Sequence, residues 1–348
     1  MVKAPTARHQ YDALADALGS RAARDQPLGP LTTYGVGGSA ALLIELEGPS
    51  DLQFVRSVLA GSDVPVCVIG RGSNLLVADG GFDGVVVRLG NGFNSVHLPD
   101  RRQAAAGPGP GPGPGPGTRA DPGDAGPFLL RAGGATPLPV LARKAADAGW
   151  AGLTWAVGVP GSVGGGVRMN AGGHGSDMAG CLVRYTWVDL LSEAGGTDDV
   201  SHLDYGYRSS AVASSEVVVE AEFVVTPGDI GHEQAEVSTI VQWRRTHQPG
   251  GSNAGSVFTN PPGDSAGRVI EQAGLKGFRL GTAHVSEKHA NFIQADKGGR
   301  ADDVRALMEH VRAAVLAHSG VTLAAEVRLL GYGAGETGVV DPAAVNSR

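Results

Sequence analysis

Three charged side chains in the second half of the chain could do chemistry together, and one of them, an arginine, is suited to holding a carboxylate. Arg208 lies in the polar segment 205–209, and its planar guanidinium can pair with a carboxylate through two parallel hydrogen bonds at any working pH. Glu326 and Arg328 are two residues apart in the alternating segment 323–330, which predicts a strand that projects both from one face. This pattern is typical of a cleft wall. The alternatives are a surface salt bridge for Arg208 and a solvated edge strand for the other two.

Glycine-rich loops are the second feature with chemical potential. Glycine makes up 55 of 348 residues, about twice the usual share of about 7%, and it stands where backbone turns sharply or approaches a ligand closely. Five clusters in the first half predict one large ligand wrapped by several loops; the alternative is a turn-rich β fold without a ligand. The clusters are 35–38, 70–72, 133–134, 158–166 and 172–175.

Two of these loops suit a pyrophosphate or a planar ring. The apolar run 66–69 leads into the turn 70–76, whose successive N–H groups would form an anion-binding concavity. Ser73 and Asn74 add further donors to that turn. The loop 158–166 would present backbone almost free of side chains. For either loop alone, a purely structural turn is at least as good an interpretation.

Motifs of other enzyme classes are missing or stand in the wrong context. Segment 35–40 fits G-x-G-x-x-A, but a strand-like run follows where a dinucleotide-binding unit needs a helix. Segment 333–338 fits G-x-G-x-x-G but leaves no room for such a unit. The sequence contains no P-loop, G-x-S-x-G or H-E-x-x-H motif. The usual motifs for nucleotide hydrolysis, for hydrolysis by a catalytic serine and for zinc catalysis are therefore missing, and no metal site is predicted.

Composition predicts a globular cytoplasmic protein. The net charge is −7 without a long Lys/Arg run, which argues against a nucleic-acid partner. No stretch approaches the roughly 20 apolar residues of a membrane span, and the first residues lack the apolar segment of a targeting signal. Only two cysteines, Cys67 and Cys181, occur, which fits a reducing compartment. Cys67 lies in an apolar run and is interpreted as a small core residue.

The elements that must position these residues are mixed helices and strands. A chain of 348 residues is long enough for two or three domains, and the pattern favours an α+β protein. Strands are predicted over 41–46, 64–69, 85–89, 93–98, 128–132, 184–190, 217–225 and 323–330. Helices are predicted from Thr136 (N-cap) and Pro137 to Gly149, from Ser265 (N-cap) to Gly274, and over the apolar stripe 304–316 to Gly320.

A low-complexity segment interrupts this pattern. Residues 107–117 alternate glycine and proline inside a polar stretch of about 100–127. Collagen's three-residue period is absent, and such a composition cannot build a core. We expect a disordered surface insertion between two strands.

Eight segments together carry a family resemblance. They are 35–38, 70–76, 158–165 with Asn170, 207–209, 255–261, 271–277, 286–292 and 326–328. In this order they resemble the UDP-N-acetylenolpyruvoylglucosamine reductases, from about Leu28 to Tyr332. The resemblance implies a two-subdomain FAD-binding fold of the vanillyl-alcohol-oxidase (PCMH) type and a C-terminal α+β domain that covers the substrate.

The resemblance also implies domain boundaries. We expect an N-terminal extension (1–27), a first FAD-binding subdomain (28–90, with 328–340 returning to it), a second FAD-binding subdomain (91–227), a substrate-binding domain (228–327) and a tail (341–348).

The implied reaction is reduction of an enol ether. FAD supplies the hydride, NADPH is the co-substrate that reduces FAD, and the product is UDP-N-acetylmuramate for peptidoglycan synthesis. The resemblance makes Ser256 the proton donor, with Arg208 and Glu326 stabilising the enolate. Without the resemblance, Ser256 is only a turn residue after Gly255.

Binding residues follow from the same motifs. The implied FAD-binding set is Tyr34, Gly35, Gly37, Gly70, Arg71, Gly72, Ser73, Asn74, Leu75, Gly158, Pro160, Gly161, Ser162, Gly164 and Asn170. The implied set for the UDP-sugar substrate is Asn260, His247, Lys288, His289 and Arg328. Two positions depart from the family, which often has lysine where His247 and Thr259 stand. No tyrosine occurs between Arg208 and Arg244, so the chain resembles the subgroup that lacks the extra Tyr-bearing loop.

Two other function classes remain open at this point. One is an FAD-dependent oxidase or dehydrogenase of the same fold that acts on an alcohol or lactone. The other is a flavin- or nucleotide-binding module without catalysis. The sequence does not determine the oligomeric state, and a monomer is the working expectation.

Overall fold

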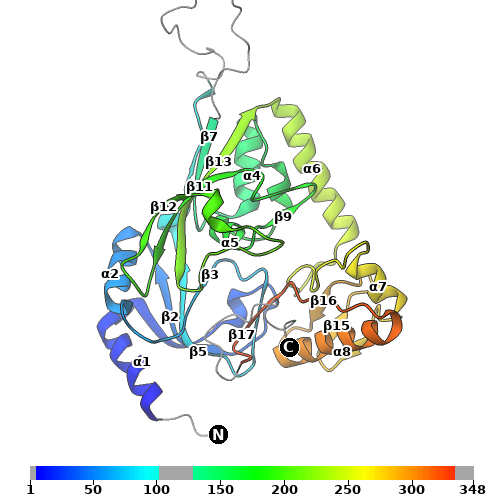
Figure 1. The fold of residues 1–348 in the computed structure, drawn as a ribbon, viewed down its shortest axis with the longest axis horizontal. Coiled ribbons are helices and arrows are strands. Elements are labelled where there is room, and N and C mark those ends of the chain that lie inside the picture. The colour runs from blue at the N-terminus through cyan, green and yellow to red at the C-terminus, as the bar shows by residue number, and fades with distance from the viewer. Residues whose placement is uncertain (1–4, 102–127, 334–348) are drawn as a thin grey trace, which may run out of the picture.

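The computed structural model describes residues 5–101 and 128–333, with side chains from residue 9 onward. The expected glycine-proline insertion, the second glycine motif beyond residue 333 and the expected tail lie outside these residues. The described chain forms three regions (Figure 1), which we call the first subdomain, the second subdomain and the third domain.

The first subdomain is a four-stranded sheet of order β1-β2-β5-β3, in which β2, β5 and β3 run parallel and β1 is antiparallel to β2. Strand β2 alternates buried and more exposed side chains because one of its faces packs on the core. Helices α1 and α2 contribute to that core. The elements are α1 (Pro5–Leu18), β1 (Ala22–Pro27), β2 (Ser39–Leu46), α2 (Pro49–Leu59), β3 (Val66–Ile69), β4 (Leu75–Val77) and β5 (Phe82–Leu89).

The second subdomain is a larger antiparallel sheet, with the path β12-β11-β13-β7-β6 and β8 paired to β13. Helices α4, α5 and α6 share its hydrophobic core, and Figure 1 shows α6 running from this sheet toward the third domain. The elements are β6 (Val96–His97), β7 (Phe128–Gly133), α4 (Leu138–Asp147), β8 (Trp150–Ala151), α5 (Val163–Arg168), β9 (Gly172–Gly173), β10 (Ser176–Asp177), β11 (Leu182–Asp189), β12 (Gly195–Asp199), β13 (Glu216–Pro227) and α6 (Ile230–His247).

The third domain packs two helices on a three-stranded antiparallel sheet. Its core also takes in Tyr34, Val36 and Leu76 from the first subdomain, so the two regions share one apolar interior. The elements are α7 (Ala266–Gln272), β14 (Arg279–Leu280), β15 (Ala283–Val285), β16 (Ile293–Ala295) and α8 (Ala301–Ser319). Short 3-10 helices connect elements at Gly19–Arg21, Gly29–Leu31, Asn91–Phe93, Thr154–Gly158 and Val200–Leu203.

The chain then returns to the first subdomain. Strand β17 (Arg328–Leu330) pairs in parallel with β4. A second link is Asp79, whose carboxylate accepts hydrogen bonds from the backbone N–H groups of Ala301 (2.9 Å) and Asp302 (3.2 Å). Asp79 therefore caps α8 from a different region, while the residue at its own N-cap position, Arg300, makes no side-chain cap.

Most predicted elements are confirmed, including the N-cap at Ser265, the left-handed Gly320 that ends α8 and the strand that follows segment 35–40. The α+β fold class is confirmed as well. The predicted cap at Thr136 is wrong: α4 begins at Leu138 with Pro137 at the N-cap, and the Thr136 hydroxyl donates to the Ser95 carbonyl instead.

Two predicted strands are shorter in the structure. Segment 93–98 contains only the two residues of β6. Segment 323–330 becomes a strand only at 328, because its earlier part pairs with residues 257–259 through a single bridge between Phe258 and Ala325. The common strand expected for Glu326 and Arg328 is therefore wrong, although both residues reach the same cleft.

Candidate active site

A cleft of about 450 Å³ brings the three predicted reaction residues together. We call the loops 70–75 and 158–166 its glycine wall, and Arg208, Ser256 and Glu326 its polar wall. Loops of all three regions line the cleft, so it forms only when they are assembled. Clefts of this size between domains are common sites for small molecules.

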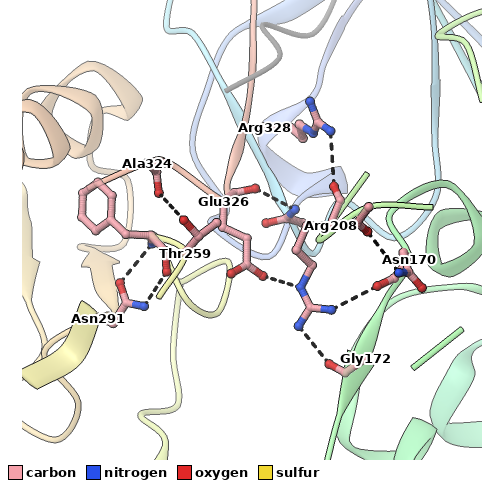
Figure 2. A network of polar contacts seen from close by, with 11 residues as sticks. Asn170, Gly172, Arg208, Thr259, Asn291, Ala324, Glu326 and Arg328 are labelled. Atoms are coloured by element: carbon pink, nitrogen blue, oxygen red, sulfur yellow. Dashed lines mark hydrogen bonds and ion pairs between the residues drawn. The ribbon is translucent and has the colours of Figure 1, made fainter. Parts of the chain in front are cut away.

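Arg208 is fixed by three hydrogen bonds, shown in Figure 2. Its Nε donates to Glu326 Oε1 (2.7 Å), and its two Nη atoms donate to the carbonyls of Asn170 (3.1 Å) and Gly172 (2.9 Å). A guanidinium has five N–H groups, so two remain for a ligand within the part of the chain that the structure describes. The side chain is 25% exposed, which leaves it accessible from the cleft.

The backbone around Arg208 is strained. Arg208 has φ +56° and Asn170 has φ +40°, a region that residues other than glycine seldom adopt. The Asn170 side chain holds the turn in place, because its Nδ2 donates to the Gly206 carbonyl (3.1 Å) and its Oδ1 accepts from the N–H of Ala179 (3.1 Å). Strain of this kind is concentrated at functional sites. The Asn170 carbonyl also accepts from Arg208, so the turn and the arginine side chain are held together.

Glu326 has an unusual protonation equilibrium. Its side chain is only 12% exposed, and burial raises the pKa of its carboxyl above the ordinary value, while the nearby Arg208 opposes that shift. This direction favours the protonated form, which could donate a hydrogen bond to a developing negative charge. Its own backbone is held as well, because the Glu326 carbonyl accepts from Asn74 Nδ2 (3.1 Å).

Ser256 reaches the cleft from a tightly held segment. The Glu326 N–H donates to the Val257 carbonyl (2.8 Å), and the Thr259 N–H donates to the Ala324 carbonyl (2.9 Å). These bonds set the register between the segments that carry Ser256 and Glu326. Within residues 5–101 and 128–333, the Ser256 hydroxyl has no hydrogen-bond partner, so its donor is available to a ligand.

The glycine wall has the features that a large dinucleotide requires. A second cavity of about 230 Å³ adjoins the cleft and shares Ile69, Gly70 and Ser162 with it. A Cβ on Gly165 would meet only Ser162 Oγ, at 3.5 Å, among the described atoms, so it would occupy ligand space. Arg88 lines the second cavity, and its buried Nε has no partner in the described chain. Glycine backbone and an arginine N–H without a partner in the described chain fit FAD with its pyrophosphate.

The predicted cofactor residues divide into two groups. Ten line the cleft, and Gly164 lines the second cavity; those in the cleft are Gly70, Arg71, Gly72, Ser73, Asn74, Leu75, Gly158, Pro160, Gly161 and Ser162. Arg71 Nε donates to the Pro160 carbonyl (3.2 Å) and so joins the two loops. Tyr34, Gly35, Gly37 and Asn170 do not line either cavity. Tyr34 is fully buried, and a Cβ on Gly37 would lie 2.6 Å from the Val77 carbonyl oxygen.

The predicted substrate residues are less concentrated. Arg328 lines the cleft, whereas Asn260, His247, Lys288 and His289 do not. Asn260 accepts from the N–H of Ala266, His247 stacks on Trp243, Lys288 donates to the Arg245 carbonyl, and burial lowers the pKa of His289. Their part in binding stays a prediction.

Sequence reasoning missed some residues of the site. Arg244 lines the cleft, where it donates to the Gly158 carbonyl and to Gln248 Oε1. Asn291 is buried behind the cleft and hydrogen-bonds the backbone of Phe258. Arg244 carried a signal, because it lies three residues before His247, one of the predicted substrate residues. Asn291 carried none, because its role depends on a contact between segments 33 residues apart.

The described part of the chain contains neither a candidate metal cluster nor a candidate membrane span. No cluster of three or more His, Cys, Asp or Glu side chains that could hold a metal ion occurs in residues 5–101 and 128–333. Within the same residues, no helix has the length and apolar character needed to cross a membrane.

Comparisons with known proteins identify the family of this chain. Residues 247–330 match the family model "UDP-N-acetylenolpyruvoylglucosamine reductase, C-terminal domain". The chain is 39% identical over 318 residues to the UDP-N-acetylenolpyruvoylglucosamine reductase of Heliobacterium modesticaldum, covering 90% of this chain and 92% of that protein. It is 39% identical over 315 residues to that of Caulobacter vibrioides, covering 88% and 94%.

A solved structure gives the same result at the level of the fold. The crystal structure of UDP-N-acetylenolpyruvylglucosamine reductase from Thermus caldophilus is similar with a TM-score of 0.70 and 30% identity. The match covers 89% of this chain and 98% of that chain. The chain therefore belongs to the family of UDP-N-acetylenolpyruvoylglucosamine reductases.

Proposed function

We propose that this protein reduces UDP-N-acetylglucosamine enolpyruvate to UDP-N-acetylmuramate with NADPH as electron donor and bound FAD. The observation that carries this proposal is the polar wall, where an arginine–carboxyl pair and an unpartnered serine hydroxyl face one cleft beside the glycine wall. FAD, when bound, would pass a hydride from NADPH to the enol ether.

Arg208 and Glu326 would stabilise the charge that hydride addition creates. When a hydride joins the methylene carbon, the π electrons of the double bond move toward the neighbouring carbon and its carboxylate. The two N–H groups of Arg208 that no described group uses can pair with that carboxylate. The buried carboxyl of Glu326, with its raised pKa, can donate a hydrogen bond to the same charge.

Ser256 would complete the reaction. Its hydroxyl donates a proton to the carbon next to the carboxylate, forming the second new C–H bond, and the resulting alkoxide regains a proton from water after the product leaves. One NADPH and one proton are consumed for each UDP-N-acetylmuramate and NADP⁺ formed. A serine is a weak acid, so this step depends on a strongly basic carbon and a site that excludes water.

The test is an NADPH-oxidation assay on the FAD-loaded protein, with and without UDP-N-acetylglucosamine enolpyruvate. We expect steady NADPH oxidation only when the substrate is present and UDP-N-acetylmuramate as the product. The rival activity, oxidation of an alcohol or lactone, would give rapid reaction of the reduced flavin with oxygen instead. A binding module would retain FAD and never oxidise NADPH.

Three further features stay predictions. They are the domain boundaries, a cytoplasmic monomer, and substrate contacts from Asn260, His247, Lys288, His289 and Arg328. Helix α6, which follows the expected boundary at residue 228, packs in the core of the second subdomain. A boundary after α6 would match that packing, and limited proteolysis of the FAD-loaded protein would locate it.

A further inference from the structure

We infer that Asn291 is a positioning residue for proton transfer, because its side-chain amide holds the segment that carries Ser256 in line with Glu326. The inference rests on the proposed function and assigns a role to a residue outside the cleft. Asn291 is 3% exposed and is absent from the cleft lining, so it acts only through its neighbours.

The side-chain amide of Asn291 hydrogen-bonds both backbone polar groups of one residue, Phe258, two positions after Ser256. Its Oδ1 accepts from the Phe258 N–H (3.0 Å), and its Nδ2 donates to the Phe258 carbonyl (2.8 Å). The backbone carbonyl of Asn291 also accepts from the Val257 N–H (2.9 Å). One asparagine therefore supplies the bonds that a neighbouring strand would otherwise provide (Figure 2).

On their other side, residues 257–258 are bound by the segment that carries Glu326. Val257 accepts from the Glu326 N–H (2.8 Å), and Phe258 forms a bridge with Ala325. Residues 257–258 are thus held between Asn291 and the chain leading to Glu326. Ser256 directly precedes this clamped pair, so the position of its hydroxyl relative to Glu326 depends on both sides of the clamp.

A neutral amide matches the two backbone groups of Phe258 better than an ionised carboxylate does. A neutral amide offers one acceptor and two donors, which matches the N–H and carbonyl of Phe258, whereas an ionised carboxylate only accepts. A buried carbonyl left without its donor is destabilised, and a displacement of about 1 Å can lower a rate by about 10². The flavin-reducing step with NADPH does not use Ser256, so it should not respond.

Asn291→Asp tests the inference because its effect can be switched by pH. Burial raises the pKa of an introduced carboxyl, and the protonated form can accept from the Phe258 N–H and donate to its carbonyl as the amide does. The FAD-loaded variant is prepared at pH 6 and mixed by stopped flow to pH 6 or pH 8.5, so that folding does not limit the measurement. Gln53→Glu, on the exposed face of α2, is the matched amide-to-acid control.

Two half-reactions are followed anaerobically, flavin reduction by NADPH and reoxidation by UDP-N-acetylglucosamine enolpyruvate. We expect the variant's reoxidation rate, relative to wild type, to be within about threefold at pH 6 and at least about tenfold slower at pH 8.5. Flavin reduction should match wild type at both values. A wild-type reoxidation rate at pH 8.5, or equal slowing of both half-reactions, would overturn the inference.

Hydrogen exchange separates this inference from the proposed function. If wild-type reduced flavin is not reoxidised by the enolpyruvate, the proposed function fails, whatever the variant does. Exchange of the Val257 amide still judges the clamp. At pH 8.5 the ionised carboxylate should repel the Phe258 carbonyl and loosen the segment, so this exchange should be faster than wild type, whereas at pH 6 it should be equal. Equal exchange at both pH values would refute it.

Discussion

The glycine wall and the polar wall of the cleft are built in opposite ways. The glycine wall presents backbone, and its glycines stand where a side chain would collide with neighbouring chain or enter ligand space. The polar wall presents individual side chains, and hydrogen bonds between distant segments hold the Arg208 side chain and the backbone beside Ser256 and Glu326. Changes in the first wall should therefore alter cofactor affinity, and changes in the second should alter reaction rate with the cofactor retained.

Ser256→Ala should give the largest effect. It is also the strongest test of whether the polar wall controls the reaction rate without controlling cofactor affinity. Loss of the proton donor should slow substrate-dependent flavin reoxidation by about 10²–10⁴, measured by anaerobic stopped flow, while FAD content stays unchanged. Ser238→Ala, on the exposed surface of α6, is the control. An unchanged reoxidation rate would remove Ser256 from the mechanism.

Arg208→Lys should come next, with a loss of about 10² in kcat/KM for the enolpyruvate substrate. A lysine keeps the charge but cannot reproduce the three-way pattern of Glu326 and the two backbone carbonyls. Steady-state kinetics at saturating NADPH measure the effect, with Arg143→Lys on the exposed face of α4 as control. Wild-type kinetics would mean that only positive charge matters at this position.

Gly72→Ala should act on the cofactor instead. Gly72 has φ +59°, and an added Cβ would lie 2.3 Å from the Leu31 carbonyl oxygen, so the turn must shift. We expect FAD to bind about tenfold more weakly, a change worth about 1.4 kcal/mol, in a fluorescence titration. Gly196→Ala, where nothing lies within 4 Å, should bind FAD normally. Unchanged affinity in the first variant would contradict a backbone-made FAD site.

Glu326→Gln should give the smallest effect, on the pH dependence of stability. Burial raises the pKa of Glu326 above its ordinary 4.5, so the native state binds more protons than the unfolded state, and this group's contribution to stability falls as pH rises above about 4.5. Glutamine removes that loss and still accepts from Arg208. The melting temperature of the variant relative to wild type should therefore rise between pH 4.5 and pH 7, by about 2–4 °C per kcal/mol. A constant difference would contradict the raised pKa.

Local signals made much of the fold and the polar wall predictable. The helix ends at Ser265 and Gly320 follow from capping chemistry within one turn, and the carboxylate-binding potential of Arg208 follows from its side chain alone. Features that depend on distant partners could not be predicted from the sequence. Contacts between segments far apart in the sequence determine the pairing of residues 323–327, the strained backbone of Arg208 and the hydrogen bonds of Asn291 to Phe258.

The cap that Asp79 places on α8 has a consequence for how the chain acquires its structure. The first N–H groups of the third domain's longest helix are satisfied by a carboxylate more than 220 residues earlier, and that domain's core contains three side chains of the first subdomain. Completion of the C-terminal part must therefore wait for the N-terminal part, which links them in one cooperative folding unit. Residues 247–330 expressed alone should show weaker amide protection at the start of α8 than in the whole protein.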